Sequence, residues 1–166
     1  LFPSDRQLRL SEKTARLFPR SLTLLDINTG IFAEEGIFDR WVSALPKSLT
    51  SLHVILAGEN VVAWPVASDW PPMLEYLLVY CKLNPPNGYS RFLRGLPRKL
   101  LTCKLISQPE SGLDNSDLAR LPPGLCSLHL PQSRLVTLEC RPHLPRYLSS
   151  LRLGKMAPDN LLDRVN

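Results

Sequence analysis

Thiol side chains are the strongest nucleophiles and metal ligands in this sequence, but their spacing brings no two of them together. Cys81, Cys103, Cys126 and Cys140 are separated by 22, 23 and 14 residues, so no C-x-x-C pair offers two thiolates to one metal ion. Cys103 takes the place of a leucine in a repeat described below, which predicts a small core hydrophobe. We expect four free thiols, no zinc, and a reducing intracellular compartment, the cytoplasm being favoured over an organelle.

The remaining candidates for chemistry are equally dispersed. His53 and His129 occupy the same place in two copies of that repeat, three copies apart, which separates them by about 14 Å at the spacing of neighbouring strands. That distance is too long for a shared metal ion, and we expect isolated surface histidines, His143 included. Glu34 and Glu35 suit the first turn of a helix better than a catalytic pair. The sequence predicts no enzyme, no metal and no cofactor.

The elements that must position these residues follow from one phrase that occurs six times. An apolar residue and a proline are followed by apolar residues three, six and eight positions after the proline. The prolines are separated by 27, 25, 26, 25 and 23 residues. They are Pro19, Pro46, Pro71, Pro97, Pro122 and Pro145. The eighteen following positions are Leu22, Leu25, Ile27, Leu49, Leu52, Val54, Leu74, Leu77, Val79, Leu100, Cys103, Leu105, Leu125, Leu128, Leu130, Leu148, Leu151 and Leu153.

Each phrase predicts a turn followed by a short strand. The last two apolar residues alternate with period 2, so their side chains leave one face of a strand, and proline suits a turn that needs no ladder N–H. Between strands, residues 34–45 predict a helix with Phe38, Trp41, Val42 and Leu45 on one face, and residues 115–121 predict another. Residues 61–68 and 135–144 contain prolines and predict irregular or 3₁₀ segments.

The phrase L-P-x-x-L-x-x-L-x-L resembles the leucine-rich repeat, in the variant whose units open with Leu-Pro. This resemblance implies an α/β solenoid, a horseshoe with a parallel inner sheet and short helices and irregular turns outside. We expect a single domain over residues 1–166, with six full repeats from about residue 18 and a partial first repeat at 1–17, as a fragment of a longer chain. In the partial repeat Leu8 and Leu10 stand for Leu25 and Ile27. The Asn or Cys that the family places after its strands is absent, which predicts irregular loops there.

Composition and charge exclude some classes of protein and narrow the partner. The 166 residues are 44% hydrophobic, with 34 Leu and 16 Pro, which suits one ordered globular domain. No apolar run reaches the roughly 18 residues of a membrane-spanning helix, so we expect no membrane insertion. The net charge is +5, and residues 84–166 carry 12 Lys/Arg against 6 Asp/Glu. The second half therefore suits an acidic partner.

Residues between the core leucines should stand in columns on the concave face of the sheet. The column seven positions after each proline contains Asp26, His53, Leu78, Lys104, His129 and Arg152. The columns five and nine positions after each proline begin, in the first full repeat, at Leu24 and Asn28. In the partial repeat we expect Gln7, Arg9 and Ser11 to precede the members at Leu24, Asp26 and Asn28. The predicted protein-binding residues combine an apolar centre with a basic flank, as interaction sites do. They are Ile55, Tyr76, Leu78, Tyr80, Lys104, Ile106, His129 and Arg152.

A protein-binding scaffold within a larger complex is therefore the favoured function, and two alternatives stay open. The positions directly after the prolines include Arg20, Lys47, Arg98 and Arg146, a basic edge that could contact the phosphates of a nucleic acid in a ribonucleoprotein assembly. Aromatic residues are not interleaved with these charges, as binding of a single strand would favour. Alternatively, the chain is the recognition domain of a longer enzyme.

Overall fold

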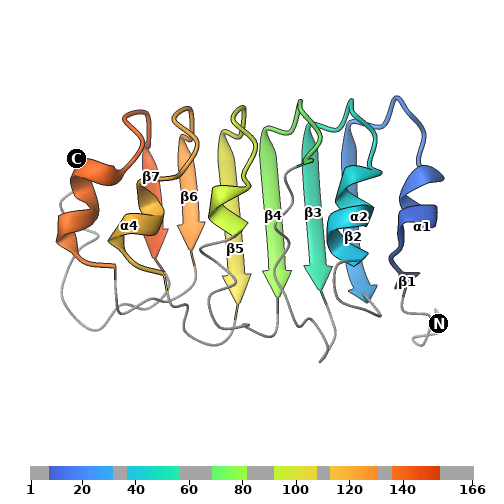
Figure 1. Cartoon of the computed structure of the whole chain (residues 1–166), viewed down its shortest axis with the longest axis horizontal. Helices are drawn as coiled ribbons and strands as arrows, with labels where there is room; N and C mark the ends of the chain where they lie inside the picture. The colour runs from blue at the N-terminus through green and yellow to red at the C-terminus, as the bar shows by residue number, and fades with distance from the viewer. Residues whose placement is uncertain are drawn as a thin grey trace.

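The computed structural model describes residues 8–31, 37–56, 69–81, 92–107, 113–130 and 136–153. Within these ranges, seven parallel strands form one sheet in the order β1-β2-β3-β4-β5-β6-β7 (Figure 1). They are β1 (Leu8–Arg9), β2 (Leu24–Ile31), β3 (Ser51–Leu56), β4 (Tyr76–Cys81), β5 (Thr102–Ser107), β6 (Ser127–Leu130) and β7 (Ser150–Leu153). Consecutive strands that are neighbours and parallel make the chain an α/β solenoid of the leucine-rich-repeat type.

Helical segments lie on one face of this sheet (Figure 1). They are α1 (Glu12–Arg16), α2 (Ile37–Ser43), α4 (Asn115–Leu118) and the 3₁₀ helix η1 (Leu138–His143), with a helical turn at residues 92–94. We call the opposite face of the sheet the open face. None of the described helices has the length and apolar character needed to cross a membrane.

The same turn precedes each of the six strands β2 to β7. The proline carbonyl accepts a hydrogen bond from the N–H of the leucine three residues later, at 3.0 to 3.1 Å in every copy. Because the proline uses only its carbonyl here, its missing N–H costs nothing. The pairs are Pro19 with Leu22, Pro46 with Leu49, Pro71 with Leu74, Pro97 with Leu100, Pro122 with Leu125 and Pro145 with Leu148.

A second set of backbone hydrogen bonds joins each repeat to the next. The Thr23 carbonyl accepts from both the Thr50 N–H at 2.8 Å and the Ser51 N–H at 3.0 Å. The carbonyls at the same place in the next repeats do the same, and Cys126 closes the series by accepting from Ser149 and Ser150. Paired donors at every step leave little freedom for one strand to slide along another, so this ladder supports the observed register.

The predicted core positions lie where the phrase places them. Fourteen of the eighteen apolar positions are buried, and the residues of β3, β4 and β5 among them are completely so. The other four are half-buried and belong to the first or the last full repeat. They are Leu22, Leu148, Leu151 and Leu153. Within the described residues the last repeat has a neighbour on one side only, and the first full repeat borders the two-residue strand β1, which accounts for the greater exposure of these leucines.

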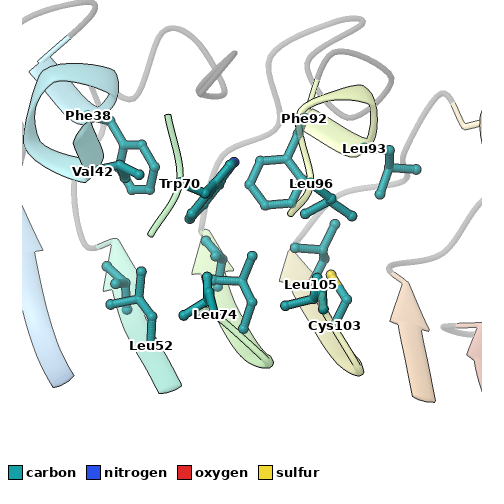
Figure 2. Packing of buried hydrophobic residues seen from close by; sticks show 14 of the residues in the cluster. Phe38, Val42, Leu52, Trp70, Leu74, Phe92, Leu93, Leu96, Cys103 and Leu105 are labelled. Carbon is teal, nitrogen blue, oxygen red and sulfur yellow. The ribbon is translucent and has the colours of Figure 1, made fainter. Parts of the chain in front are cut away.

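Aromatic residues fill the space between the helical segments and the sheet (Figure 2). Phe38 of α2 contacts Trp70 at 6.2 Å between ring centroids, and Trp70 contacts Phe92 at 5.8 Å, both in edge-to-face geometry. Trp70 is the residue before Pro71, where other repeats carry leucine or phenylalanine. We call Phe38, Trp70 and Phe92 the aromatic row; it joins the outer sides of three neighbouring repeats.

The predicted outer segments are confirmed in type where the structure describes them, but both helices end earlier than predicted. In α2, Phe38, Trp41 and Val42 are buried as expected, and Leu45 is buried just beyond its end. The helix expected at 115–121 is shorter, with α4 ending at Leu118. The segment expected to be irregular or 3₁₀ around Pro142 contains η1. Residues 34–36, 61–68 and the loops that directly follow β3 to β7 lie outside the described residues.

The register predicted for the partial first repeat is wrong. Leu8 pairs with Gly30 and Arg9 with Ile31, not with Leu25 and Asp26. Arg9 and Ser11 therefore do not lead the predicted columns, and Gln7 lies outside the described residues. Ser11, two residues after the end of β1, caps α1 instead. Its side chain accepts from the Thr14 N–H at 3.2 Å, and Thr14 Oγ1 accepts from the Ser11 N–H at 2.9 Å.

A bulge also removes Asn28 from its predicted column. Ile27 pairs with Val54 and Gly30 with Leu56, so two residues of β2, Asn28 and Thr29, oppose the single residue Ile55. An extra residue in one strand breaks the regular alternation of faces. Among the described residues, the third column therefore runs across β3, β4 and β5.

Candidate protein-binding face

The pairing of the strands brings the predicted binding residues together on the open face. Along the central column, Leu78 of β4 stands opposite Lys104 of β5, followed by His129 of β6 and Arg152 of β7. Ile55, Tyr80 and Ile106 face one another across β3, β4 and β5 in the next column. Tyr76 lies two residues before Leu78, opposite Ser51 and Thr102. All eight predicted residues thus occupy five adjacent strands.

Alternating burial shows which face these side chains occupy. In β4, Leu77 and Val79 are completely buried, whereas Tyr76, Leu78 and Tyr80 are half-buried. Since successive side chains of a strand leave opposite faces, the half-buried set lies on the open face, away from the helical segments. We call Ile55, Tyr76, Leu78, Tyr80 and Ile106 the central patch. It is an apolar and aromatic surface over three neighbouring strands.

Basic side chains lie beside the central patch, on the strands that follow it towards β7. Lys104, His129 and Arg152, which we call the basic row, are successive partners on β5, β6 and β7. Lys104 also joins the two regions, because its Nζ lies over the Tyr76 ring at 5.6 Å from the centroid. This distance is within the range of a cation–π interaction.

The histidine of the basic row is held towards its neutral form. Burial lowers the pKa of His129, and the positive charges of Arg152 and Lys104 on either side lower it further. Burial disfavours a charged imidazole, and like charges on neighbouring strands oppose a third one. The open face therefore carries a site where bound negative charge would be stabilised.

The opposite end of the central column is acidic. Asp26 Oδ2 lies 3.2 Å from His53 Nδ1, and the two side chains are 46% and 30% exposed. The expectation that His53 is an isolated surface histidine is therefore wrong. Asp26 and His53 are adjacent in the predicted column, and that adjacency is the sequence signal for this pair. Along this column the charge changes from negative on β2 to positive on β7.

Nothing among the described residues assembles a metal or thiol site. No group of three or more His, Cys, Asp or Glu side chains in the described ranges could hold a metal ion. Cys103 is completely buried, and that burial raises the pKa of its thiol to about 12. Burial raises the pKa of the Cys140 thiol as well. Because the thiolate is the reactive form, both cysteines behave as core residues.

Thiol titration tests the prediction of four free cysteines. Cys103, Cys126 and Cys140 are free thiols in the structure, and the side chain of Cys81 lies outside the described residues. We expect four reactive thiols per chain in denaturant without reductant. In the native protein, Cys103 should react only as fast as the chain opens, because its side chain is completely buried. Detection of two thiols or none would contradict the prediction and the reducing compartment inferred from it.

The basic edge beside the proline turns is exposed. Arg20, Lys47, Arg98 and Arg146 all have exposed side chains. The expectation that aromatic residues are absent among these charges needs one correction, since the Arg146 guanidinium lies over the Tyr147 ring at 4.6 Å from its centroid. This is the one cation–π contact that the described residues make along the basic edge.

Comparisons with known proteins returned little. No protein-family model matches the chain, and no curated protein matches it. Among solved structures, the leucine-rich repeat-containing protein LegL7 from Legionella pneumophila is similar at a TM-score of 0.47 and 11% sequence identity. The similarity covers 89% of this chain and 54% of that protein, so the chain spans about half of its length. A similarity this weak carries no argument, and the fold rests on the strand order and register described above.

Proposed function

We propose that this chain is a leucine-rich repeat protein of the Leu-Pro variant, and that it is a non-enzymatic scaffold that binds a protein partner through its open face. The observation that supports the proposal most is the central patch. Its tyrosines and aliphatic residues lie outside the core, on a face that the described helices leave uncovered. Apolar surface rimmed by polar residues is typical of interaction sites, and tyrosine is prominent among residues that dominate binding energy.

The chain fits a component of a larger assembly better than an isolated module. The half-buried leucines of the last repeat, such as Leu151 and Leu153, leave apolar surface at the end of the described sheet. Terminal repeats of solenoids need a cover over that surface. A neighbouring subunit, or more of the same chain, would supply it. We also propose an intracellular, reducing setting, for which the free thiols are the argument.

Truncation of the two tyrosines tests the proposal. Tyr76 and Tyr80 both lie on the open face, so the double variant Tyr76→Ala/Tyr80→Ala removes contact surface without opening a core cavity. We expect binding to the protein partner to weaken by at least about 2 kcal/mol, the threshold of a hot spot. The melting temperature should change little. Isothermal calorimetry with the partner, purified after affinity capture, measures the first quantity, and thermal unfolding measures the second.

A matched control is available on the same face. Ser127→Ala changes an open-face residue of β6 outside the central patch, and we expect wild-type affinity from it. A partner that contacts α2 and α4 while both tyrosines remain exposed to solvent in the complex would refute the proposal.

Nucleic acid is the second candidate, favoured by the exposed basic edge. If it is correct, RNA affinity should fall steeply with salt and with Arg98→Ala/Arg146→Ala.

A further inference from the structure

We propose that the basic row is a carboxylate-binding site for an acidic segment of the partner protein, and that the central patch accepts an apolar residue of the same segment. This inference rests on the proposed function and specifies the partner's chemistry. It starts from the alignment of Lys104, His129 and Arg152 on three successive strands, all on the open face. Neighbouring strands lie about 4.8 Å apart, so one negative group can contact two of these side chains at once.

Within the described part of the chain, no carboxylate neutralises this row. Asp26 of β2, the acidic residue of the central column, is paired with His53 of β3. Lys104 and Arg152 form no ion pair with a described residue, and the Nζ of Lys104 lies over the ring of Tyr76. Aligned positive charges repel one another, and a carboxylate between them would replace that repulsion with attraction. The pKa of His129, lowered by its surroundings, agrees with this geometry.

The surface beside the row favours a protein segment over a polyphosphate chain. The central column continues from Lys104 to Leu78, and the neighbouring columns carry Tyr76 and Tyr80. A nucleic acid backbone carries a phosphate at every step and would place some against the aliphatic part of this surface. A peptide that combines apolar and acidic residues matches both halves of the face by charge complementarity.

The spacing of the face sets the spacing of the segment. In an extended chain, side chains on one side recur about every 6.8 Å. Lys104 and His129 lie about 5 and 10 Å from Leu78 across the strands. If an apolar residue of the segment lies at Leu78, the residue two positions later falls between Lys104 and His129. The residue four positions later, at about 14 Å, falls beside Arg152. The inferred segment therefore has an apolar residue followed by acidic residues at alternate positions.

A blocked synthetic peptide with the core Phe-Ser-Glu-Ser-Glu, and its Glu→Gln counterpart, test the inference. We expect the glutamate peptide to bind. Each of its two glutamates should contribute about fivefold through a surface ion pair, so the glutamine peptide should bind about 25-fold more weakly. Lys104→Ala and Arg152→Ala should each weaken the glutamate peptide about fivefold. Arg98→Ala, which removes one positive charge from the basic edge, is the control for net charge and should have no effect.

The pH dependence of binding provides a second readout. The charged groups that face His129 from the adjacent strands are Lys104 on β5 and Arg152 on β7. A bound carboxylate favours the imidazolium and raises the pKa of His129 in the complex, so binding should strengthen as the pH falls. We expect a gain of about fivefold between pH 7.5 and 5.5. His129→Gln should abolish this gain, and His53→Gln should keep it.

Each negative result has a defined meaning. Equal affinities of the glutamate and glutamine peptides, or no binding of the glutamate peptide at millimolar concentration, would overturn the inference. If binding of the partner still needed Tyr76 and Tyr80 but ignored Lys104→Ala and Arg152→Ala, the proposed function would hold and this inference alone would fail. Tighter binding of a single-stranded RNA oligonucleotide than of the glutamate peptide, lost in Lys104→Ala, would also overturn it, because the row would then recognise phosphate.

Discussion

Leu77→Ala is expected to lower the free energy of unfolding by about 2 to 5 kcal/mol, the cost of deleting a buried leucine side chain and leaving a cavity. Leu77 is completely buried in β4, the middle strand of the sheet, between Leu52 of β3 and Cys103 of β5. Packed repeats on both sides hold their positions, so the site cannot collapse around the smaller side chain. Leu128→Ala in β6 should be comparable, because Leu128 is also completely buried. Urea denaturation followed by circular dichroism measures both.

The last repeat provides the matched comparison. Leu151 occupies the same place as Leu77 in its own repeat, but its side chain is only half-buried. Leu151→Ala removes the same atoms and should cost clearly less, because part of that side chain is already in water. An unchanged unfolding midpoint in Leu77→Ala would mean that the register is wrong. Equal losses for Leu77→Ala and Leu151→Ala would mean that a further element covers the end of the sheet.

The repeated phrase predicted the part of the fold that local chemistry determines. Proline followed by a leucine three residues on specifies both the turn and the start of the strand, and the next two apolar positions specify the buried face. That information lies within nine residues, as in the copy from Pro71 to Val79. The central column from His53 to Arg152 follows from it directly, since strands that begin with the same turn align in the same register.

What the sequence could not predict depends on contacts between segments that lack the phrase. β1 has only two residues, and it pairs with Gly30 and Ile31 at the end of a lengthened β2. The bulge after Ile27 lies within this longer strand, and the repeated phrase, which ends at Ile27, does not indicate it. The Asp26–His53 pair was visible as a column but not as a contact, because side-chain conformation decides whether two neighbours meet.

Trp70→Ala is expected to destabilise the chain by about 3 to 5 kcal/mol, because a large side chain would leave the space between three repeats. Trp70 is only 6% exposed and is the central member of the aromatic row, in contact with Phe38 on one side and Phe92 on the other. Phe92→Ala should cost a similar amount. In a double-mutant cycle the two losses should be non-additive by about 0.5 to 1.5 kcal/mol, the value of an aromatic pair beyond its buried area.

Trp70→Phe separates the contribution of the ring from that of its polar atom. The buried Nε1 of Trp70 has no hydrogen-bond partner among the described residues. An unsatisfied buried donor opposes folding, and phenylalanine removes it while keeping an aromatic ring for both neighbours. We therefore expect Trp70→Phe to be much milder than Trp70→Ala in the same urea denaturation experiment. If the two variants lost equal stability, the volume of the indole, not its aromatic contacts, would decide the packing. Because the aromatic row lies on the helical side of the sheet, folded Trp70→Phe should bind the glutamate peptide with wild-type affinity, which separates the structural side of the sheet from the side proposed to bind.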